Sequence, residues 1–466
     1  MFDINLGSPQ YRRVHFIGIG GISMSGLAEI LIDKGFSVSG TDTTDSQIVE
    51  HLRAMGAEIF IGHSKDNIGD ADLVVYTDAI SPDNEELLAA IDSPAPVIDR
   101  AAFLGAVMRN YKNSIAVSGT HGKTTTTSMI ATIINNPNIN PTILLGGELD
   151  DIGGNVKLGS DDYLLTEACE YKANILKYFP SIAIVLNIDE DHLDFFKSMD
   201  HISDTFKGYL QNLSGDDHAI LNNDDPLVRK LIPDLNSKVV TFGIEEPSDF
   251  EARNIRFNEK GFPVYDLYLD GEKFETISLS VMGVHNVYNS LAAIAATHLI
   301  GLDSSVISDR ISAYRGVHRR LEHKGYLGNI EIIDDYAHHP TEIKASLRAL
   351  RNATDKKIFC IFQPHTFTRT KILLDSFSES FKDADKIIIA DIYAAREKDL
   401  GEIHSRELAL RIKDKGYDAT YLGSFDEIES FILRETSNSD LVVTMGAGNV
   451  FKIGDNLLKK KLNKVI

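Results

Sequence analysis

The chain has 466 residues, 43% of them hydrophobic, and its formal net charge at pH 7 is −21. This length exceeds what one hydrophobic core supports and predicts about three globular domains. The acidic excess argues against a nucleic acid or an anionic membrane surface as partner, because binding either of them requires a basic face.

The first segment alternates short apolar runs with helical patterns, which is typical of a parallel α/β domain. Its strands are expected at residues 14–17, 36–40 and 73–76. A glycine-rich turn at 18–26 follows the first strand, and Asp42 follows the second. This spacing is typical of a Rossmann-type phosphate turn with a carboxylate for a ribose, although Ser23 replaces the third glycine of the dinucleotide fingerprint. We expect a nucleotide or sugar-nucleotide diphosphate here, with a purely structural turn as the alternative.

The second segment begins with the apolar run 115–117, which is followed by Ser-Gly-Thr-His-Gly-Lys-Thr-Thr at 118–125. Glycines let backbone N–H groups converge on phosphate oxygens, Lys123 supplies a charge for the terminal phosphates, and the Thr124 hydroxyl suits Mg²⁺. Val117 stands where the general P-loop pattern has its first glycine, so the loop is a shortened variant. The motif predicts a nucleoside triphosphate site. An ordinary strand–turn–helix with a surface lysine is the alternative.

Acidic residues follow two later strands of this segment, which are expected at 163–166 and 182–188. One cluster contains Glu167, and the other spans 187–194 with His192 among its carboxylates. Ligands of open α/β sheets bind outside the carboxyl ends of the strands, so both clusters are expected near the phosphate loop. Glu167 and an acid of the second cluster suit Mg²⁺, with His192 as a nitrogen ligand or orienting group. A surface position is the alternative for His192.

The region 239–279 contains a predicted β-hairpin, because residues alternate at 264–269 and end in the turn Asp270-Gly271. The central domain is therefore expected to have a mixed sheet.

A helix rich in small residues is expected at 291–298, and Asn286 and Asn289 precede it. Residues three apart lie on one helical face. Their amides suit recognition of an adenine edge or, alternatively, capping of the helix.

The third segment repeats the α/β pattern, with strands expected at 330–333, 358–362, 387–390 and 441–444. Residues 334–342, Asp-Asp-Tyr-Ala-His-His-Pro-Thr-Glu, follow the first of these strands, and a loop at 362–370 with His365 and Arg369 follows the second. Such a density of His, Asp and Arg at consecutive strand ends indicates a ligand site. Pro340 and the arginine loop favour anion and nucleotide contacts, and a zinc site is the alternative.

No apolar run approaches the roughly 20 residues that span a bilayer. The first residues lack the layout of a secretory signal, so we expect a cytoplasmic protein. Cys169 and Cys360 lie in unrelated sequence contexts and are expected to be buried thiols, not a disulfide or a metal site.

Taken together, these motifs resemble those of the Mur ligases of peptidoglycan synthesis. The matching motifs occur in the order of the family, at 18–21, 24–29, 119–125, 167–168, 191–192, 285–289, 316–320, 334–340, 363–365 and 446–448. The shortened phosphate loop agrees with this resemblance, because the loop of that family is of the Gly-Thr-x-Gly-Lys-Thr type.

The resemblance implies an α/β protein with a Rossmann-like N-terminal domain, a central P-loop ATPase domain with a mixed sheet, and a Rossmann-like C-terminal domain. The expected bounds are 1–109 for the UDP-sugar domain, 110–315 for the ATP domain and 316–466 for the amino-acid and nucleotide domain. It implies ATP and Mg²⁺ as cofactors and the ligation of L-alanine to the carboxylate of UDP-N-acetylmuramate through an acyl phosphate. These small molecules are the expected partners, with no nucleic acid or membrane, and the chain is expected to be a monomer or weak homodimer.

The resemblance also implies roles for particular residues. Those expected in catalysis are Lys123, Glu167, His192 and His338. Those expected to bind ATP are Gly119, Thr120, His121, Gly122, Lys123, Thr124, Thr125, Asn286, Arg320 and Asp335. Those expected to bind the UDP-sugar are Gly18, Gly20, Gly21, Ser23, Asp42 and Thr77. Those expected to bind the amino acid are Tyr336, His365 and Arg369, and those expected to bind metal are Thr124, Glu167 and His192.

Two residues depart from the family pattern, namely Asn449, where an acid is usual, and Thr366, where some members have a second arginine. His338 is our hypothesis for the base that deprotonates the amine, and hinges are expected near Asn110 and Gly316. Three alternatives stay open: a recycling ligase that adds a murein tripeptide to the same sugar, a dehydrogenase, and a nucleotide-dependent binding protein without catalysis.

Overall fold

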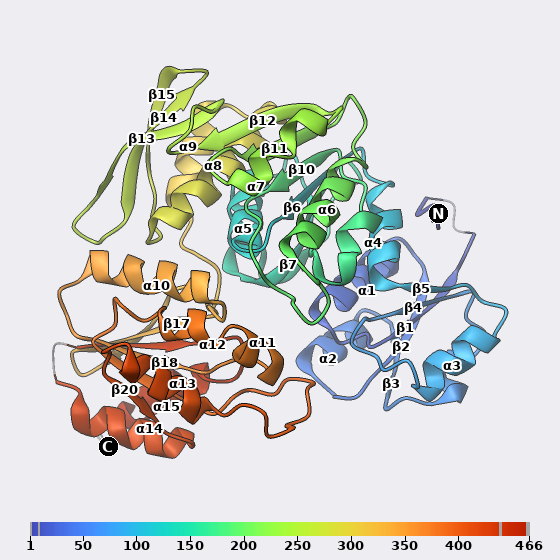
Figure 1. Ribbon diagram of the computed structural model, residues 1–466. Coiled ribbons are helices and arrows are strands. Elements are labelled where there is room, and N and C mark those ends of the chain that lie inside the picture. Colours follow the sequence, from blue (N-terminus) through green and yellow to red (C-terminus); the bar gives the residue numbers. More distant parts are fainter. Residues whose placement is uncertain (1, 8–9, 438–439, 463–466) are drawn as a thin grey trace. The chain divides into compact units, whose positions relative to one another are not determined.

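The computed structural model describes residues 2–7, 10–437 and 440–462 (Figure 1). The chain divides into two compact units, each of which contains helices and parallel strands. Unit 1 comprises Met1–Ile188, Asp200–Phe242 and Ala292–Ile307, and unit 2 comprises Asp189–Met199, Gly243–Leu291 and Ser308–Ile466. The α/β fold class expected from the sequence is confirmed.

Unit 1 begins with a parallel sheet of five strands in the order β3-β2-β1-β4-β5. The strands are β1 Arg13–Ile17, β2 Ser37–Asp42, β3 Glu58–Ile61, β4 Leu73–Tyr76 and β5 Val97–Asp99. The helices are α1 Ile22–Asp33, α2 Gln47–Ala54, η1 Lys65–Ile68, α3 Glu85–Asp92 and α4 Arg100–Met108. The central strand β1 pairs with both β2 and β4, so the strand order reverses where β1 ends. This is the point at which open α/β sheets bind ligands.

The part of the second sheet that belongs to unit 1 has the strand order β12-β11-β10-β6-β9-β7-β8. Its strands are β6 Asn113–Ser118, β7 Thr142–Leu149, β8 Gly154–Lys157, β9 Tyr163–Glu167, β10 Ile182–Val185, β11 His218–Asn222 and β12 Lys238–Gly243. The helices are α5 Lys123–Ile134, η2 Asp150–Ile152, η3 Tyr171–Lys177, α6 Met199–Leu210, α7 Pro226–Arg229 and η4 Ile232–Asp234. Only β7 and β8 pair antiparallel among these strands, so the expected mixed sheet is confirmed.

The strand expected at 182–188 is shorter than predicted, because β10 ends at Val185. Beyond it, the backbone N–H of Leu186 donates to the carbonyl oxygen of Ser118, and Asn187 turns toward the phosphate loop. The apolar pattern continues past the strand because Leu186 and Ile188 are still buried. The sequence predicted too long a strand because these buried apolar residues continue past the last residue that pairs in the sheet.

Helix α4 packs so closely on the last residue of η3 that Gly105 has no room for a side chain. A Cβ atom at Gly105 would lie 1.9 Å from the carbonyl oxygen of Lys177. We expect Gly105→Ala to lower the free energy of unfolding by about 1–3 kcal/mol or more, because the backbone would have to move. Urea unfolding measures the change. Gly215→Ala is the control, since its Cβ would meet its nearest atom at 3.8 Å, and equal losses in both variants would contradict the prediction.

Unit 2 contains an antiparallel meander of β13 Phe250–Phe257, β14 Pro263–Leu269 and β15 Glu272–Ser278. The expected hairpin is confirmed, and its turn residues Asp270 and Gly271 both have positive φ, 47° and 82°. Helices α8 Val284–Leu299 and α9 Ser304–Ala313 follow. Helix α8 starts seven residues before the predicted residue 291, so Asn286 and Asn289 lie inside it.

The third sheet, also in unit 2, has the strand order β16-β17-β21-β18-β19-β20 and is parallel except for β16. Its strands are β16 Glu322–Leu327, β17 Ile330–Asp335, β18 Ile358–Phe362, β19 Lys386–Ile389, β20 Ala419–Tyr421 and β21 Leu441–Met445. The helices are α10 Pro340–Ala353, α11 Phe367–Ile372, α12 Leu374–Ser378, α13 Ser405–Asp414, α14 Phe425–Glu435 and α15 Phe451–Leu462. The predicted strands of the third segment are confirmed within two residues at each end.

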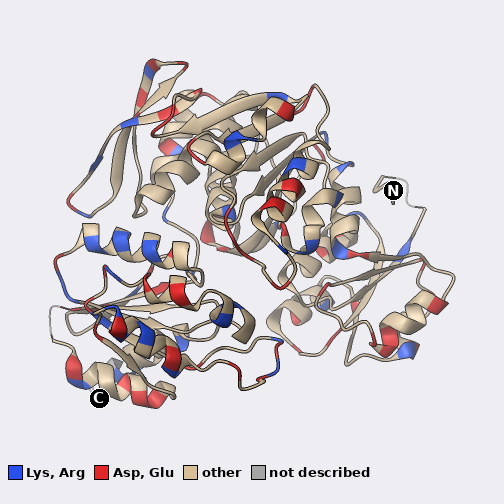
Figure 2. Cartoon of the chain, in the orientation of Figure 1, with Lys and Arg blue, Asp and Glu red and all other residues tan. Residues whose placement is uncertain are grey.

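Charges of both signs lie on the helices of unit 2 (Figure 2). Basic residues of α10 pair with nearby acids: Arg348 contacts Asp383, and Arg351 contacts Asp385. Within the described part of the chain, no helix combines the length and the apolar character needed to cross a membrane.

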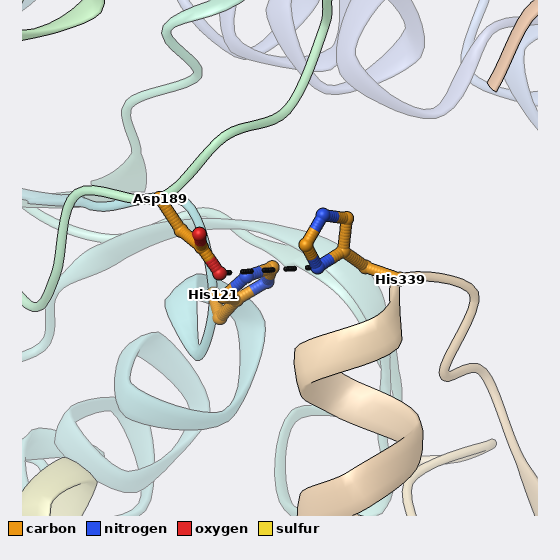
Figure 3. A group of neighbouring side chains, drawn as sticks. All are labelled: His121, Asp189 and His339. Carbon is orange, nitrogen blue, oxygen red and sulfur yellow. Dashed lines mark ion pairs between the residues drawn. The ribbon is translucent and has the colours of Figure 1, made fainter. Parts of the chain in front are cut away.

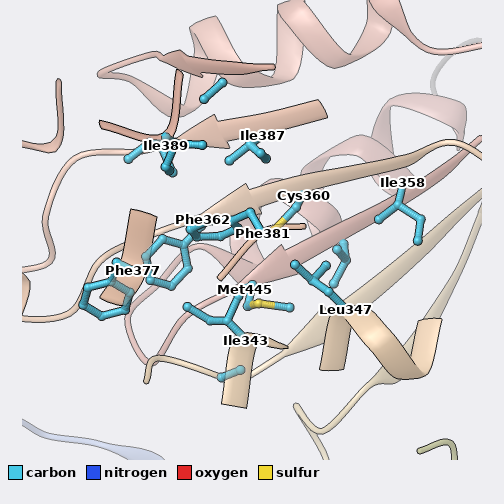
Figure 4. Packing of buried hydrophobic residues seen from close by; sticks show 14 of the residues in the cluster. Ile343, Leu347, Ile358, Cys360, Phe362, Phe377, Phe381, Ile387, Ile389 and Met445 are labelled. Atoms are coloured by element: carbon cyan, nitrogen blue, oxygen red, sulfur yellow. The ribbon is translucent and has the colours of Figure 1, made fainter. Parts of the chain in front are cut away.

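Helices cover both faces of the third sheet, which explains its strongly apolar strands. Successive residues point to opposite faces, so Ile333 and Cys360 join one buried cluster with α10 and α12, whereas Ile332 and Ile361 join another with α14 and α15. Figure 4 shows part of the first cluster, in which Phe362 lies between Phe377 and Phe381. The two apolar clusters hold the sheet between its helices. The polar loops lie at the carboxyl ends of the strands.

Candidate active site

The glycine turn of unit 1 follows β1 and is held by the residues predicted beside it. The N–H of Gly20 donates to Asp42 Oδ2 at 2.9 Å, and the N–H of Gly18 donates to the carbonyl oxygen of Thr41 at 2.8 Å. Gly18 has φ +83°, and a Cβ there would come within 2.6 Å of the Thr77 side chain. The structure therefore brings Gly18, Gly20, Asp42 and Thr77 together, as the sequence predicted.

The turn leads directly into α1, whose first residues include Ser23. Gly21 is the N-terminal flanking residue and supplies no side-chain cap. The N–H groups at a helix start and the helix dipole make the end of α1 suitable for an anion. Asp42 contacts the turn through its carboxylate and also accepts from the N–H of Thr44 at 3.1 Å.

The phosphate loop connects β6 to α5 between the neighbouring strands β10 and β9. Gly119 has φ +129° and Gly122 has φ +85°, so glycine is required at both positions. Asn187, which follows β10, accepts from the N–H of His121 at 2.8 Å and donates to its carbonyl oxygen at 3.1 Å. The sequence analysis missed this role of Asn187, because it depends on β10 lying beside β6.

Lys123 reaches back over the loop. Its ammonium group donates to the carbonyl oxygen of Thr120 at 3.1 Å and pairs with Glu170 Oε2 at 3.0 Å. Burial opposes the charge, but the carboxylate of Glu170 outweighs it and raises the pKa of Lys123 above its ordinary value. Lys123 is therefore charged at neutral pH, as a phosphate-binding lysine must be. The sequence analysis assigned no role to Glu170, which follows Glu167 by three residues.

Thr124 and Glu167 form the predicted pair of oxygen donors. Thr124 Oγ1 donates to Glu167 Oε2 at 3.0 Å, and the other carboxylate oxygen accepts from the N–H of Gly146 at 2.6 Å. Gly146 is required here, because a Cβ would lie 2.8 Å from the carboxylate. Hydroxyl and carboxylate oxygens are the donors that Mg²⁺ prefers, so this pair fits the predicted metal.

His192 belongs to unit 2 and has an unusual backbone, with φ +54°. Its N–H donates to Asp191 Oδ1 at 2.7 Å, and its Nε2 lies 3.9 Å from Asp191 Oδ2. Asp191 also accepts from Arg369 at 2.9 Å. Burial would raise the pKa of Asp191, but the charges of His192 and Arg369 lower it well below its ordinary value.

Four rings form a row at the carboxyl edge of the third sheet. The ring centroids of Tyr336 and His338 are 5.5 Å apart, those of His338 and His365 are 5.8 Å apart, and those of His365 and Tyr393 are 5.8 Å apart. The three predicted residues are therefore neighbours within unit 2. Tyr393 was not predicted, because only the bridge between His365 and Tyr393 brings its loop beside β18.

The tautomer of His338 suits a base. Its Nδ1 lies 3.0 Å from the carbonyl oxygen of Tyr336, to which it donates when the ring is neutral. Burial lowers the pKa of His338 to about 4, so the ring is neutral at pH 7 and carries its lone pair on Nε2.

Asp335 and Arg320 also lie at this edge. Asp335 accepts from the N–H groups of Leu321 and Ala337 at 2.8 and 2.6 Å, and burial raises its pKa to about 6. The Arg320 guanidinium lies 5.2 Å from the centroid of the Tyr336 ring and 3.6 Å from Glu342.

Arg319 was not assigned a role, yet its guanidinium links a strand end to a loop. It donates to Asp334 at 3.1 Å, to the carbonyl oxygen of Gly446 at 2.7 Å and to that of Gly448 at 3.2 Å. The end of β17 and the loop after β21 are thereby joined through one guanidinium.

The two departures from the family pattern have local partners. Asn449 exchanges hydrogen bonds with Gln363, because its side chain accepts from Nε2 and its N–H donates to Oε1, at 3.1 and 3.0 Å. Thr366 has φ +66° and is the N-cap of α11, with its hydroxyl accepting from the N–H of Arg369 at 3.4 Å. Both residues therefore support the loops that carry His365 and Arg369.

Asn286 and Asn289 are buried and bound to each other. Asn289 donates to Asn286 Oδ1 at 2.9 Å, and Asn286 donates to the carbonyl oxygen of Met282 at 2.7 Å. An adenine contact of Asn286 stays a prediction.

His339 uses both ring nitrogens in unit 2. It caps α10 by accepting from the N–H of Thr341, and its Nε2 donates to the carbonyl oxygen of Glu190 at 3.0 Å. Figure 3 shows the Asp189 carboxylate, which lies 3.9 Å from Nδ1 of His339 and accepts from Thr341 Oγ1 at 2.6 Å. These contacts explain the polar loop at 339–342 as a helix start.

The low pKa of His338 should make the free energy of unfolding depend on pH, and replacement of His338 should remove this dependence. Between about pH 4 and the ordinary value of 6.5, the unfolded chain binds a proton at this position that the folded chain does not. Below pH 6.5 the folded state therefore loses stability until the folded pKa is reached. We expect His338→Gln to remove this contribution, so that urea unfolding of the variant depends less on pH over that range. Parallel pH profiles for both proteins would contradict the assignment.

Comparison with known proteins agrees with this geometry. Residues 13–112 match the family model described as Mur ligase family, catalytic domain; 117–297 match the Mur ligase middle domain; and 319–448 match the Mur ligase, glutamate ligase domain. The UDP-N-acetylmuramate–L-alanine ligase of Acetivibrio thermocellus is 49% identical to this chain, over 98% of this chain and 97% of the relative.

Two solved structures have the same fold. The UDP-N-acetylmuramate-alanine ligase of Thermotoga maritima is 28% identical, with a TM-score of 0.81 and coverage of 97% of this chain and 99% of that one. A murein peptide ligase from Psychrobacter arcticus is 25% identical, with a TM-score of 0.71 and coverage of 97% and 98%. Together with the three matched models, these similarities establish that the chain belongs to the Mur ligase family.

Proposed function

We propose that this chain joins L-alanine to the carboxylate of UDP-N-acetylmuramate at the expense of ATP, giving ADP, phosphate and UDP-N-acetylmuramoyl-L-alanine. The observation that carries this proposal is the phosphate loop with charged Lys123 beside the Thr124–Glu167 pair. Relatives that are nearly half identical over the whole chain bear the name of this activity.

The reaction needs ATP because a carboxylate does not react with an amine. In the first step, a carboxylate oxygen attacks the γ-phosphorus of ATP, and the bond from that phosphorus to the bridging oxygen of ADP breaks. The product is an acyl phosphate, whose leaving group is phosphate. In the second step, the amine nitrogen of alanine attacks the acyl carbon, phosphate departs, and a base takes the proton of the amine.

Residues of unit 1 suit the first step. Lys123 places a positive charge beside the loop and would stabilise the charge that develops on the transferred phosphoryl group. Thr124 and Glu167 would hold Mg²⁺, which supplies a further positive charge against the phosphate oxygens when it is bound. We propose the glycine turn with Asp42 and Thr77 as the site of the UDP moiety.

Residues of unit 2 suit the second step. Arg369 would pair with the carboxylate of the amino acid, and Tyr336 and His365 lie in the same row of rings. His338 would accept the proton of the amine at Nε2. We keep Asn286, Arg320 and Asp335 as proposed ATP contacts and His192 as a proposed metal ligand.

The sites expected in three domains, 1–109, 110–315 and 316–466, must converge during the reaction, so we propose that the domains close on the substrates. Gly316, with φ +100°, suits a hinge between the last two. Small-angle scattering should show a smaller radius of gyration when an ATP analogue and UDP-N-acetylmuramate are added together. An unchanged radius would contradict closure.

The deciding experiment incubates the purified protein with ATP, Mg²⁺, UDP-N-acetylmuramate and single amino acids, and measures phosphate release and product mass. We expect phosphate release that depends on alanine, and one ¹⁸O atom from a labelled substrate carboxylate in the released phosphate. Stronger activity with a murein tripeptide would favour the recycling ligase. Phosphate release without product would favour a nucleotide-dependent binding protein, and a change in nicotinamide absorbance would favour a dehydrogenase.

A further inference from the structure

Unit 1 contains a cavity between the start of α1, the start of α4 and the end of β9. Its empty space amounts to about 550 Å³ when the adjoining open solvent is included. Its lining includes Ile22 and Ser23, beside the glycine turn, and Thr166 and Glu167, beside the phosphate loop. The cavity therefore connects the proposed site of the UDP moiety with the proposed site of phosphoryl transfer.

The wall of this cavity combines apolar and polar groups. Its apolar side chains are Leu27, Leu104, Leu144, Leu145 and Val156. Arg100, Tyr178 and Cys169 line it as well. A pocket with an apolar wall and a few convergent polar groups is typical of small-molecule sites.

Arg100 is the first residue of α4 and has no carboxylate within ion-pair distance in residues 2–7, 10–437 and 440–462. The nearby Asp78 is engaged by Asn174 at 2.7 Å. Burial opposes the charge of Arg100, but the neighbouring Tyr178 and Cys169 groups raise its pKa. A partly buried guanidinium that lacks a carboxylate partner indicates an anionic ligand, because burial of an unpaired charge is costly.

Tyr178, which interacts with Arg100, provides a second observation. Its side chain is completely buried, and its hydroxyl makes no well-formed hydrogen bond with any residue that the structure describes. Arg100 lies close enough to act on this hydroxyl electrostatically. Buried hydroxyls nearly always have a partner, so Tyr178 OH is suited to donate to a ligand in the cavity.

The position of these groups distinguishes between the anions of the substrate. The start of α1 already offers N–H groups for the pyrophosphate, whereas Arg100 lies near Cys169, two residues after Glu167. The carboxylate that reacts with ATP must come close to Glu167, because Glu167 is bound to Thr124 of the phosphate loop. An arginine and a hydroxyl together are well suited to orient a carboxylate.

We propose that Arg100 and Tyr178 bind the carboxylate of the sugar acid and make the site specific for an acidic over a neutral UDP-sugar. This inference rests on the proposed function and adds the residues that select its substrate. Arg100 would hold the carboxylate in place, and Lys123 with Glu167 would serve the phosphoryl group.

The test compares UDP-N-acetylmuramate with UDP-N-acetylglucosamine, which lacks the carboxylate but carries the same pyrophosphate. Binding is measured by calorimetry without ATP. We expect Arg100→Met to weaken binding of the acidic ligand by about tenfold or more and to leave binding of the neutral ligand unchanged. Tyr178→Phe should weaken the binding of the acidic ligand alone, by a smaller factor than Arg100→Met does. Arg100→Lys should fall between wild type and Arg100→Met.

Arg13→Met is the matched control, because Arg13 begins β1 at the opposite end from the glycine turn and pairs with Asp72. It should bind both ligands as the wild type does. Binding of an ATP analogue verifies that each variant is folded. If Arg100→Met does not fold, the same comparison with Tyr178→Phe and Arg100→Lys decides.

If Arg100→Met weakened the binding of both UDP-sugars equally, the proposal would be overturned, because Arg100 would then contact the pyrophosphate. Unchanged binding of both would overturn it as well. These outcomes differ from failure of the proposed function, which would appear in the wild type as no preference for UDP-N-acetylmuramate and no alanine-dependent product.

Discussion

Replacement of Lys123 by methionine is expected to lower kcat/KM for the ligase reaction by about 100-fold or more, which matches the loss of one preorganised electrostatic donor. The ammonium group lies over the loop carbonyls and pairs with Glu170, which is only 2% exposed. The substitution therefore removes a charge from the site of phosphoryl transfer and leaves a buried carboxylate without its partner. Initial rates of ADP formation at varied ATP measure the first effect, and urea unfolding measures the second.

Two further variants separate these effects. Glu170→Gln keeps the lysine and removes only its partner, so it should reduce kcat/KM much less than Lys123→Met. Lys112→Met is the matched control, because Lys112 is exposed and lies just before β6. If Lys123→Met retained a kcat/KM close to that of the control, Lys123 would have no part in the chemistry.

Replacement of Arg369 by methionine is expected to lower the free energy of unfolding by about 3 kcal/mol and to raise the KM for alanine strongly. The guanidinium donates to Asp191 from Nε and from one terminal nitrogen, at 3.2 and 2.9 Å, and both side chains are largely buried. The remaining terminal nitrogen lies 3.2 Å from Nδ1 of His365. The loss in stability arises because Asp191 is left buried without this positive charge.

A double variant distinguishes support of the fold from amino-acid binding. Arg369→Met combined with Asp191→Asn removes both charges and should recover part of the lost stability. The KM for alanine should stay high, because the proposed partner of its carboxylate is still absent. Recovery of both properties would show that Arg369 acts only through Asp191.

Local sequence patterns predicted most of the fold and the residues of each loop. The glycine turn with Asp42 and the loop with Lys123 were predictable because each motif combines a strand end with required glycines over a short span. The alternation of residues also predicted the hairpin at Asp270. Errors arose where an apolar pattern continued past an element, as at the end of β10, or where a helix began among polar residues, as in α8.

Other features depend on contacts between distant parts of the sequence. Glu170 and Asn187 contact the phosphate loop only because β9 and β10 flank β6. Tyr393 reaches His365 from the loop that follows the neighbouring strand β19. The sequence shows that Glu170 and Asn187 are polar residues that follow strands, but it does not show which residues they contact.

The guanidinium of Arg319 has a mechanical consequence. Because it contacts Asp334, Gly446 and Gly448, the end of β17 and the loop after β21 cannot shift independently without breaking charge-assisted bonds. The thermal displacements of these two segments should therefore be correlated. A molecule that displaces one segment would therefore also displace the other, without any rearrangement of the sheet beneath them.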